Sequence, residues 1–145
     1  MTSWTQIFPA MGTPAPDNAF GAGNEADGQP LFIARAVIAG SYCIGKYGAH
    51  LGGANFPYGG KETPVTSAVE IYSGAGTWKP AAPGKLPLGA FVAGLEADGT
   101  PLFVARAHHG GGIHPGKYSA KYGKCYIPWG GKEFEVTSHF EILCL

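Results

Sequence analysis

Two pairs of oppositely charged side chains have the types and spacing needed to bind a polar ligand. Glu25 and Lys46 each lie near a glycine, and 71 residues later Glu96 and Lys117 occupy the equivalent positions. A carboxylate accepts hydrogen bonds and an ammonium group donates them. Together they can bind two neighbouring hydroxyls of a sugar, and a nearby glycine lets a ligand approach the backbone closely. We therefore predict that these four residues bind carbohydrate, with solvated surface charge as the alternative.

The charged pairs recur because the chain contains an internal repeat. Segments 16–71 and 87–142 align without a gap, and 31 of their 56 positions are identical. A duplication of this kind indicates tandem structural units that complete each other's core. Each unit alone is too small to bury its faces. We expect one domain over 1–145, made of repeats at about 1–73 and 74–145 that are related by an internal pseudo-twofold axis.

The elements that position these residues are predicted to be strands. The 145 residues include 24 glycines and 12 prolines, and no segment shows a sustained helical period. In the first repeat, Asp27-Gly28 predicts a tight hairpin turn, because both central residues of such a turn need positive φ. An apolar strand is expected over 31–38 and a second turn at Gly45-Lys46, and the second repeat follows the same plan. The fold class is therefore all-β, with short antiparallel sheets packed together.

The expected turns create a distance problem for the charged pairs. In a simple meander they place Glu25 and Lys46 at opposite ends of one strand of eight residues, roughly 26 Å long. One sugar could not contact both side chains. Either the strands do not form a meander, or the repeats share their sites, with Glu25 beside Lys117 and Glu96 beside Lys46.

Two arginines interrupt the apolar strands and must be paired. Arg35 and Arg106 lie at equivalent positions inside these strands, and a buried guanidinium needs a hydrogen-bonded counter-charge. The nearest candidates in the repeat are Glu62 and Glu133 of the two Gly-Gly-Lys-Glu segments. We expect structural ion pairs between these four residues.

The overall charge, the cysteines and the N-terminal residues indicate which partners and which location to expect. Ten basic residues balance ten acidic residues, so the chain lacks the clustered basic charge of a nucleic-acid-binding protein. The three cysteines form no C-x-x-C motif and are expected to be free and buried.

The N-terminal residues do not resemble a signal peptide and no apolar segment is long enough to span a bilayer. We expect a cytoplasmic protein without membrane insertion by this chain alone, with release by an unconventional route left open.

No motif predicts catalysis, a metal or a cofactor. None of the five histidines is matched between the repeats, and the G-x-S-x-G and H-E-x-x-H motifs are absent. Glu25 and Asp27 could in principle form a glycosidase pair. An exposed site near a hairpin turn is a poor place to raise the pKa of a catalytic acid. We predict that the protein is not an enzyme.

The repeated motif resembles a known family. The pattern A-G-x-[DE]-x-D-G-x-x-L-[FY]-[IV]-A-R-A, followed by G-K and by a proline, an aromatic residue and G-G-K-E, is similar to the DM-nine repeat. Its segments are residues 22–36, 45–46 and 57–62, and again 93–107, 116–117 and 128–133. The resemblance covers nearly the whole chain. It extends to mannose-specific lectins and to the lectin-like module of natterin-like proteins.

The resemblance implies a β-rich pseudo-twofold protomer, a homodimer and recognition of mannose or mannose-containing glycans, as in innate immunity. It places sugar binding on the acidic residue after A-G-x and on the lysine of G-K, which are Glu25, Lys46, Glu96 and Lys117 here. A non-carbohydrate protein-interaction or trafficking module is the alternative function.

Overall fold

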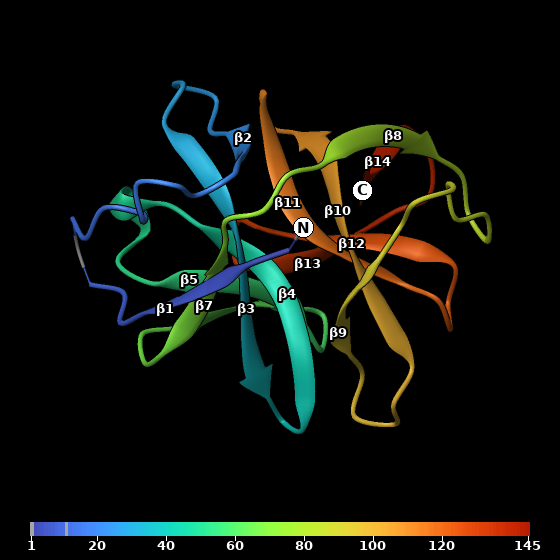
Figure 1. The fold of residues 1–145 in the computed structure, drawn as a ribbon, viewed down its shortest axis with the longest axis horizontal. Coiled ribbons are helices and arrows are strands. Elements are labelled where there is room, and N and C mark those ends of the chain that lie inside the picture. The colour runs from blue at the N-terminus through green and yellow to red at the C-terminus, as the bar shows by residue number, and fades with distance from the viewer. Residues whose placement is uncertain (1, 11) are drawn as a thin grey trace.

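The computed structural model in Figure 1 describes residues 2–10 and 12–145 and confirms the all-β prediction. The first repeat contributes seven strands and a short 3-10 helix, η1. These elements are β1 (Trp4–Ile7), β2 (Gly21–Asn24), β3 (Pro30–Ile38), β4 (Ser41–Tyr47), η1 (Ala49–Leu51), β5 (Ala54–Tyr58), β6 (Lys61–Val65) and β7 (Val69–Tyr72). The β2–β3 hairpin encloses the predicted Asp27-Gly28 turn.

The second repeat follows the same plan with seven strands. They are β8 (Thr77–Ala81), β9 (Val92–Leu95), β10 (Pro101–His109), β11 (Gly112–Ser119), β12 (Lys124–Trp129), β13 (Lys132–Val136) and β14 (Phe140–Cys144). Within each repeat the strands pair antiparallel with their neighbours. Over the described residues all fourteen strands join in one hydrogen-bonded network.

The repeats are joined by strands that pair across the middle of the molecule. β2 of the first repeat pairs with β11 through Asn24 and Ile113, and β9 of the second pairs with β4 through Leu95 and Tyr42. In Figure 1, β2 lies beside β11 at the top and β9 lies beside β4 at the bottom. The two contacts are equivalent under exchange of the repeats, which is the signature of an isologous, twofold interface.

The hairpin between β3 and β4 turns earlier than the sequence predicted. Its central residues are Ala39 and Gly40, with φ of 48° and 81°, and the second repeat has its turn at 110–111. The predicted turn at Gly45-Lys46 is wrong. These two residues lie within β4, where a side chain on Gly45 would overlap the carbonyl oxygen of Asn55. The glycine is needed for close packing of β4 on β5.

This shift in the turn removes the distance problem. Lys46 lies opposite Ile33, and Asn24 lies opposite Pro30, so Lys46 and the residue after Asn24 are at the same end of β3. The strands do form a meander. Because β4 runs back along most of β3, the acidic residue and the lysine of one repeat come together without exchange between repeats.

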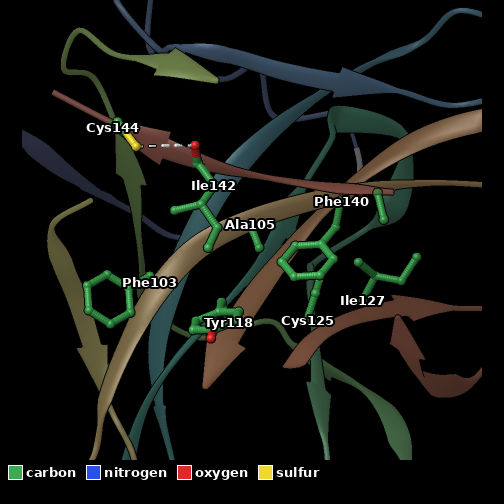
Figure 2. Packing of buried hydrophobic residues seen from close by; sticks show 9 residues of the cluster. Phe103, Ala105, Tyr118, Cys125, Ile127, Phe140, Ile142 and Cys144 are labelled. Atoms are coloured by element: carbon green, nitrogen blue, oxygen red, sulfur yellow. Dashed lines mark hydrogen bonds between the residues drawn. The ribbon is translucent and has the colours of Figure 1, made fainter. Parts of the chain in front are cut away.

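The core consists of three apolar clusters, one in each repeat and one between them. Figure 2 shows the second-repeat cluster, in which Phe103 of β10, Tyr118 of β11 and Phe140 of β14 surround Cys125 and other buried side chains. The central cluster combines residues of both repeats: Ala22, Ile33, Ile44, Tyr72, Ala93, Leu102, Val104 and Leu143. The three cysteines are free and buried.

Arg35 and Arg106 are paired, but with other glutamates than predicted. Arg35 Nε lies 2.9 Å from Glu70 Oε1, and Arg106 Nε lies 2.8 Å from Glu141 Oε1. The expected partners Glu62 and Glu133 are wrong, because the register of β3 against β7 places Glu70 directly opposite Arg35. The same register holds between β10 and β14.

Each arginine also connects the two repeats. Arg35 Nη1 donates to the carbonyl oxygen of Ala93 at 3.2 Å, and Arg106 Nη1 donates to that of Ala22 at 3.0 Å. The guanidinium groups stack over Trp4 and Trp78, at 3.9 and 4.2 Å from the ring centroids. Such cation–π contacts add to the ion pairs. The arginines therefore hold β2 and β9 in place across the pseudo-twofold axis.

We predict that Gly23→Ala destabilises the protein strongly. An added methyl group at Gly23 would overlap the carbonyl oxygen of Ile113, where β2 crosses to β11. Forcing extra atoms into such a contact costs about 1–3 kcal/mol. Denaturant unfolding should show this loss for Gly23→Ala. Gly21→Ala on the same strand is the control, because nothing lies within 4 Å of its added carbon. Equal stability of the two variants would contradict the close contact.

Candidate functional site

The lysine of the second repeat lies between two carboxylates. Lys117 is on β11 and is 5% exposed. Its Nζ lies 4.0 Å from Glu96 Oε1 and 3.7 Å from Glu133 Oε2. Glu96 follows β9 and Glu133 is on β13, so three strands converge on one ammonium group. The predicted pairing of Glu96 with a lysine therefore occurs within one repeat.

The first repeat completes this site across the pseudo-twofold axis. The ring of Tyr58 lies 5.4 Å from Lys117 Nζ, and Cys43 Sγ lies 3.7 Å from it. Tyr126 of the second repeat places its ring 5.9 Å from the same nitrogen. Burial raises the pKa of the Tyr126 phenol to about 12, so its hydroxyl stays a neutral donor. Burial also raises the pKa of the Cys43 thiol to about 11.

A cavity of about 320 Å³ opens above Lys117. It is lined by Tyr58, Gly59, Glu96, Lys117, Ser119, Tyr122, Tyr126 and Glu133. This volume lies at the small end of the range for ligand pockets, which combine aromatic walls with a few polar groups. We call it the second-repeat pocket. It presents an ammonium group, two carboxylates and three phenol rings to one ligand-sized space.

Two polar atoms of this pocket have no hydrogen-bond partner among the described residues. They are Glu96 Oε1 and Ser119 Oγ, and both are buried. Lys117 Nζ is too far from Glu96 Oε1, at 4.0 Å, for a hydrogen bond. A buried polar atom without a partner costs about 1–3 kcal/mol. A small side-chain movement that opens these atoms to the pocket would let a ligand hydroxyl or a water molecule donate to each of them.

The equivalent residues of the first repeat are already paired with protein groups. Lys46 is 2% exposed, and its Nζ lies 3.8 Å from Glu62 Oε2 and 3.0 Å from His114 Nδ1. Glu25 Oε2 lies 2.7 Å from His50 Nε2. Exchange of the repeats relates His50 to Lys121 and His114 to Cys43, so the second-repeat site has neither histidine. The first-repeat site is therefore less available to a ligand.

The two Gly-Gly-Lys-Glu segments bind each other across the axis. Glu62 Oε1 accepts a hydrogen bond from the backbone of Gly131 at 2.9 Å, and Glu133 Oε1 accepts one from Gly60 at 2.9 Å. The second oxygen of each carboxylate faces the lysine of its own repeat. These glutamates, predicted as arginine partners, instead position the lysines and the loop that carries Tyr58.

The described residues contain no group of three or more His, Cys, Asp or Glu side chains that could hold a metal ion. No helix in the described part of the chain is long and apolar enough to cross a membrane.

The lowered pKa of His114 predicts how the stability of the protein changes with pH. Burial, together with the Lys46 charge, lowers the pKa of His114 to about 4 from 6.5. Lys46 Nζ donates to Nδ1, so the native ring is neutral. Because the unfolded chain binds a proton more readily, the contribution of His114 to stability is complete above pH 6.5. It is lost as the pH falls toward 4, by up to about 3 kcal/mol.

The test compares the wild type with His114→Asn. The amide oxygen of asparagine can accept from Lys46 but does not titrate. Unfolding free energies measured from pH 7 to pH 4 should fall less steeply for the variant. Parallel curves for the two proteins would show that His114 does not titrate abnormally in the folded state.

Comparisons with known proteins place the chain in a family. The fold is similar to the crystal structure of the nematode sperm cell motility protein MFP2B, with a TM-score of 0.71 and 16% sequence identity. The match covers 99% of this chain and 46% of that one, so the chain spans about half the length of that protein. No curated protein sequence matched the chain.

The family model described as "DM9 repeat" matches residues 3–65 and 65–136, which together cover most of the chain. The family is one of generally non-catalytic binding modules and supports a carbohydrate-binding-like function. The chain belongs to the DM9 repeat family, as two repeats in tandem.

Proposed function

We propose that the protein is a non-catalytic lectin that binds mannose-type sugars. The predicted residues Glu96 and Lys117 would bind the sugar in the second-repeat pocket, and Glu25 and Lys46 would do so in the first repeat. The proposal rests above all on the two buried, unpartnered atoms of the pocket, Glu96 Oε1 and Ser119 Oγ. A sugar hydroxyl can donate to each of them.

The walls of the pocket suit the other surfaces of a sugar. Tyr58, Tyr122 and Tyr126 line it and offer apolar ring faces for the C–H groups of a pyranose, while their hydroxyls remain available for hydrogen bonds. The ammonium group of Lys117 can donate to a second hydroxyl. Glu96 and Glu133 lie within 4.0 Å of the same ammonium group and can accept from further hydroxyls.

The two repeats are expected to bind with unequal affinity. In the first repeat a sugar must displace the contact between Lys46 and His114 or that between Glu25 and His50. In the second-repeat pocket the equivalent partner of Lys117 is the Cys43 thiol at 3.7 Å, a weaker acceptor than a histidine ring. Lys121, at the position of His50, pairs with Asp98 and leaves Glu96 without that contact. We therefore assign the stronger binding to Glu96 and Lys117. A homodimer would link these sites and add avidity, as a lectin in pathogen or glycan recognition requires.

We expect Glu96→Gln and Lys117→Met each to weaken mannose binding by about 10- to 100-fold. A hydrogen bond to a charged group contributes about 1.5–3 kcal/mol, which corresponds to this loss in affinity. Calorimetric titration with mannose measures the effect, and thermal unfolding of each variant verifies that it is folded. Lys124→Ala is the control, because this exposed lysine on β12 pairs with Glu135 and does not line the pocket.

Unchanged mannose affinity in both variants would remove these residues from the site. If the wild type binds no sugar on a glycan array but retains a protein partner that free mannose does not displace, the protein is a non-carbohydrate interaction module.

A further inference from the structure

The first repeat carries two further cavities that share part of their walls. One cavity, of about 390 Å³, lies between Glu25 and Trp129, and the other, also about 390 Å³, lies between Phe32 and the loop at 14–17. Gln29 and His50 line both cavities. The two spaces are therefore adjacent parts of one surface, which we call the first-repeat groove. Each part is larger than the second-repeat pocket.

The chemistry of the groove changes along its length. At one end is the indole of Trp129, held by ring contacts with His109 and Phe134 at 4.7 and 6.2 Å between centroids. The middle is polar. Asp27 accepts hydrogen bonds from the Gln29 side chain at 2.8 Å and from the Gln29 backbone at 3.1 Å. These hydrogen bonds lower the pKa of Asp27, which keeps it a charged acceptor.

The other end of the groove is apolar and is held in position by the chain before β2. Pro14, Pro16 and Phe32 line it. The backbone of Gly12 donates to the carbonyl oxygen of Ala49 at 2.9 Å, and the Tyr47 hydroxyl donates to that of Thr13. These two hydrogen bonds tie the loop to β4 and η1. The apolar wall is thus a defined surface of the fold.

The second repeat does not reproduce this arrangement. Lys121 and Asp98 occupy the positions of His50 and Asp27, and they form an ion pair of 3.0 Å. The segment that links the tryptophan of each repeat to the matched proline is also three residues shorter, because Trp78 precedes Pro87 by nine residues and Trp4 precedes Pro16 by twelve. Leu88 also occupies the position of Asp17, which lines the wall in the first repeat.

We propose that the first-repeat groove binds two or more consecutive sugar units of a glycan chain, while the second-repeat pocket binds a single sugar. A glycan chain presents apolar ring faces and rows of hydroxyls in succession. The groove offers aromatic and proline surfaces at both ends, with carboxylate, amide and imidazole groups between them. Two adjoining spaces, each larger than the single-sugar pocket, provide room for neighbouring units. This inference rests on the proposed lectin function and adds a second ligand class to it.

The test compares mannose with the linear trisaccharide mannotriose by amide NMR and calorimetry. Mannotriose should shift the amides of Asp27 and Gln29 and the indole signal of Trp129, and it should bind at least about tenfold more tightly than mannose. Gln29→Ala should abolish this gain and leave mannose affinity of the second-repeat pocket unchanged, because Gln29 does not line that pocket. Thr100→Ala is the matched control at the equivalent position of the second repeat, and it should keep the gain.

The outcomes separate this inference from the lectin proposal. If mannotriose causes no shift in the groove, or if Gln29→Ala and Thr100→Ala behave alike, the groove is not a glycan site. Mannose-induced shifts at Glu96 and Ser119 would then leave the lectin proposal intact. Groove shifts with mannotriose in a Glu96→Gln background would support the groove even where the second-repeat pocket no longer binds mannose.

Discussion

The close approach of the two repeats along the pseudo-twofold axis is the contact on which the other features of the structure depend. β2 and β9 each pair with a strand of their own repeat and also with a strand of the other, and glycines at 23 and 94 let the backbones come together. Arg35 and Arg106 secure the same strands by donating to carbonyl oxygens across the axis. Because these contacts fix how the repeats face each other, they also decide which side chains surround each lysine.

The second-repeat pocket illustrates this dependence. Its acid and lysine come from one repeat, but Tyr58 and Gly59 come from the other and are held there by the hydrogen bond between Gly60 and Glu133. A single repeat could supply the charges without the wall that encloses them. The tandem arrangement therefore provides a second site and also supplies part of the pocket wall from the other repeat.

Divergence between the repeats has made the two sites different. Exchange of the repeats relates His114 to Cys43, and Trp129 to Tyr58. The first change gives Lys46 a hydrogen-bond acceptor that Lys117 lacks, apart from a thiol at 3.7 Å. The second replaces a phenol by a larger indole at the edge of the first-repeat groove. A few substitutions on one scaffold therefore yield an open pocket in the second repeat. In the first repeat they yield a groove in which histidines already contact the acid and the lysine.

The sequence predicts the strands and the repeat well but not the contacts between strands. The Asp27-Gly28 hairpin follows from local turn chemistry. The Ala39-Gly40 turn does not, because a non-glycine residue with positive φ is uncommon and Ala-Gly carries a weaker signal than Gly-Lys. Gly45 is needed for packing against β5, which no local pattern shows. The Arg35 partner depends on the register of β3 against β7, and sequence proximity to the Gly-Gly-Lys-Glu motif pointed to the wrong glutamate. Retention in both repeats singles out the acid and the lysine of each repeat, and their role in sugar binding stays a prediction.

The most direct test of sugar binding at Glu96 and Lys117 is a crystal structure of the protein soaked with mannose. We predict a sugar in the second-repeat pocket, with hydroxyls within hydrogen-bond distance of Glu96 Oε1, Ser119 Oγ and Lys117 Nζ, and a ring face against one of the tyrosines. A bound sugar located elsewhere, with water molecules alone on these three atoms at saturating mannose, would contradict it.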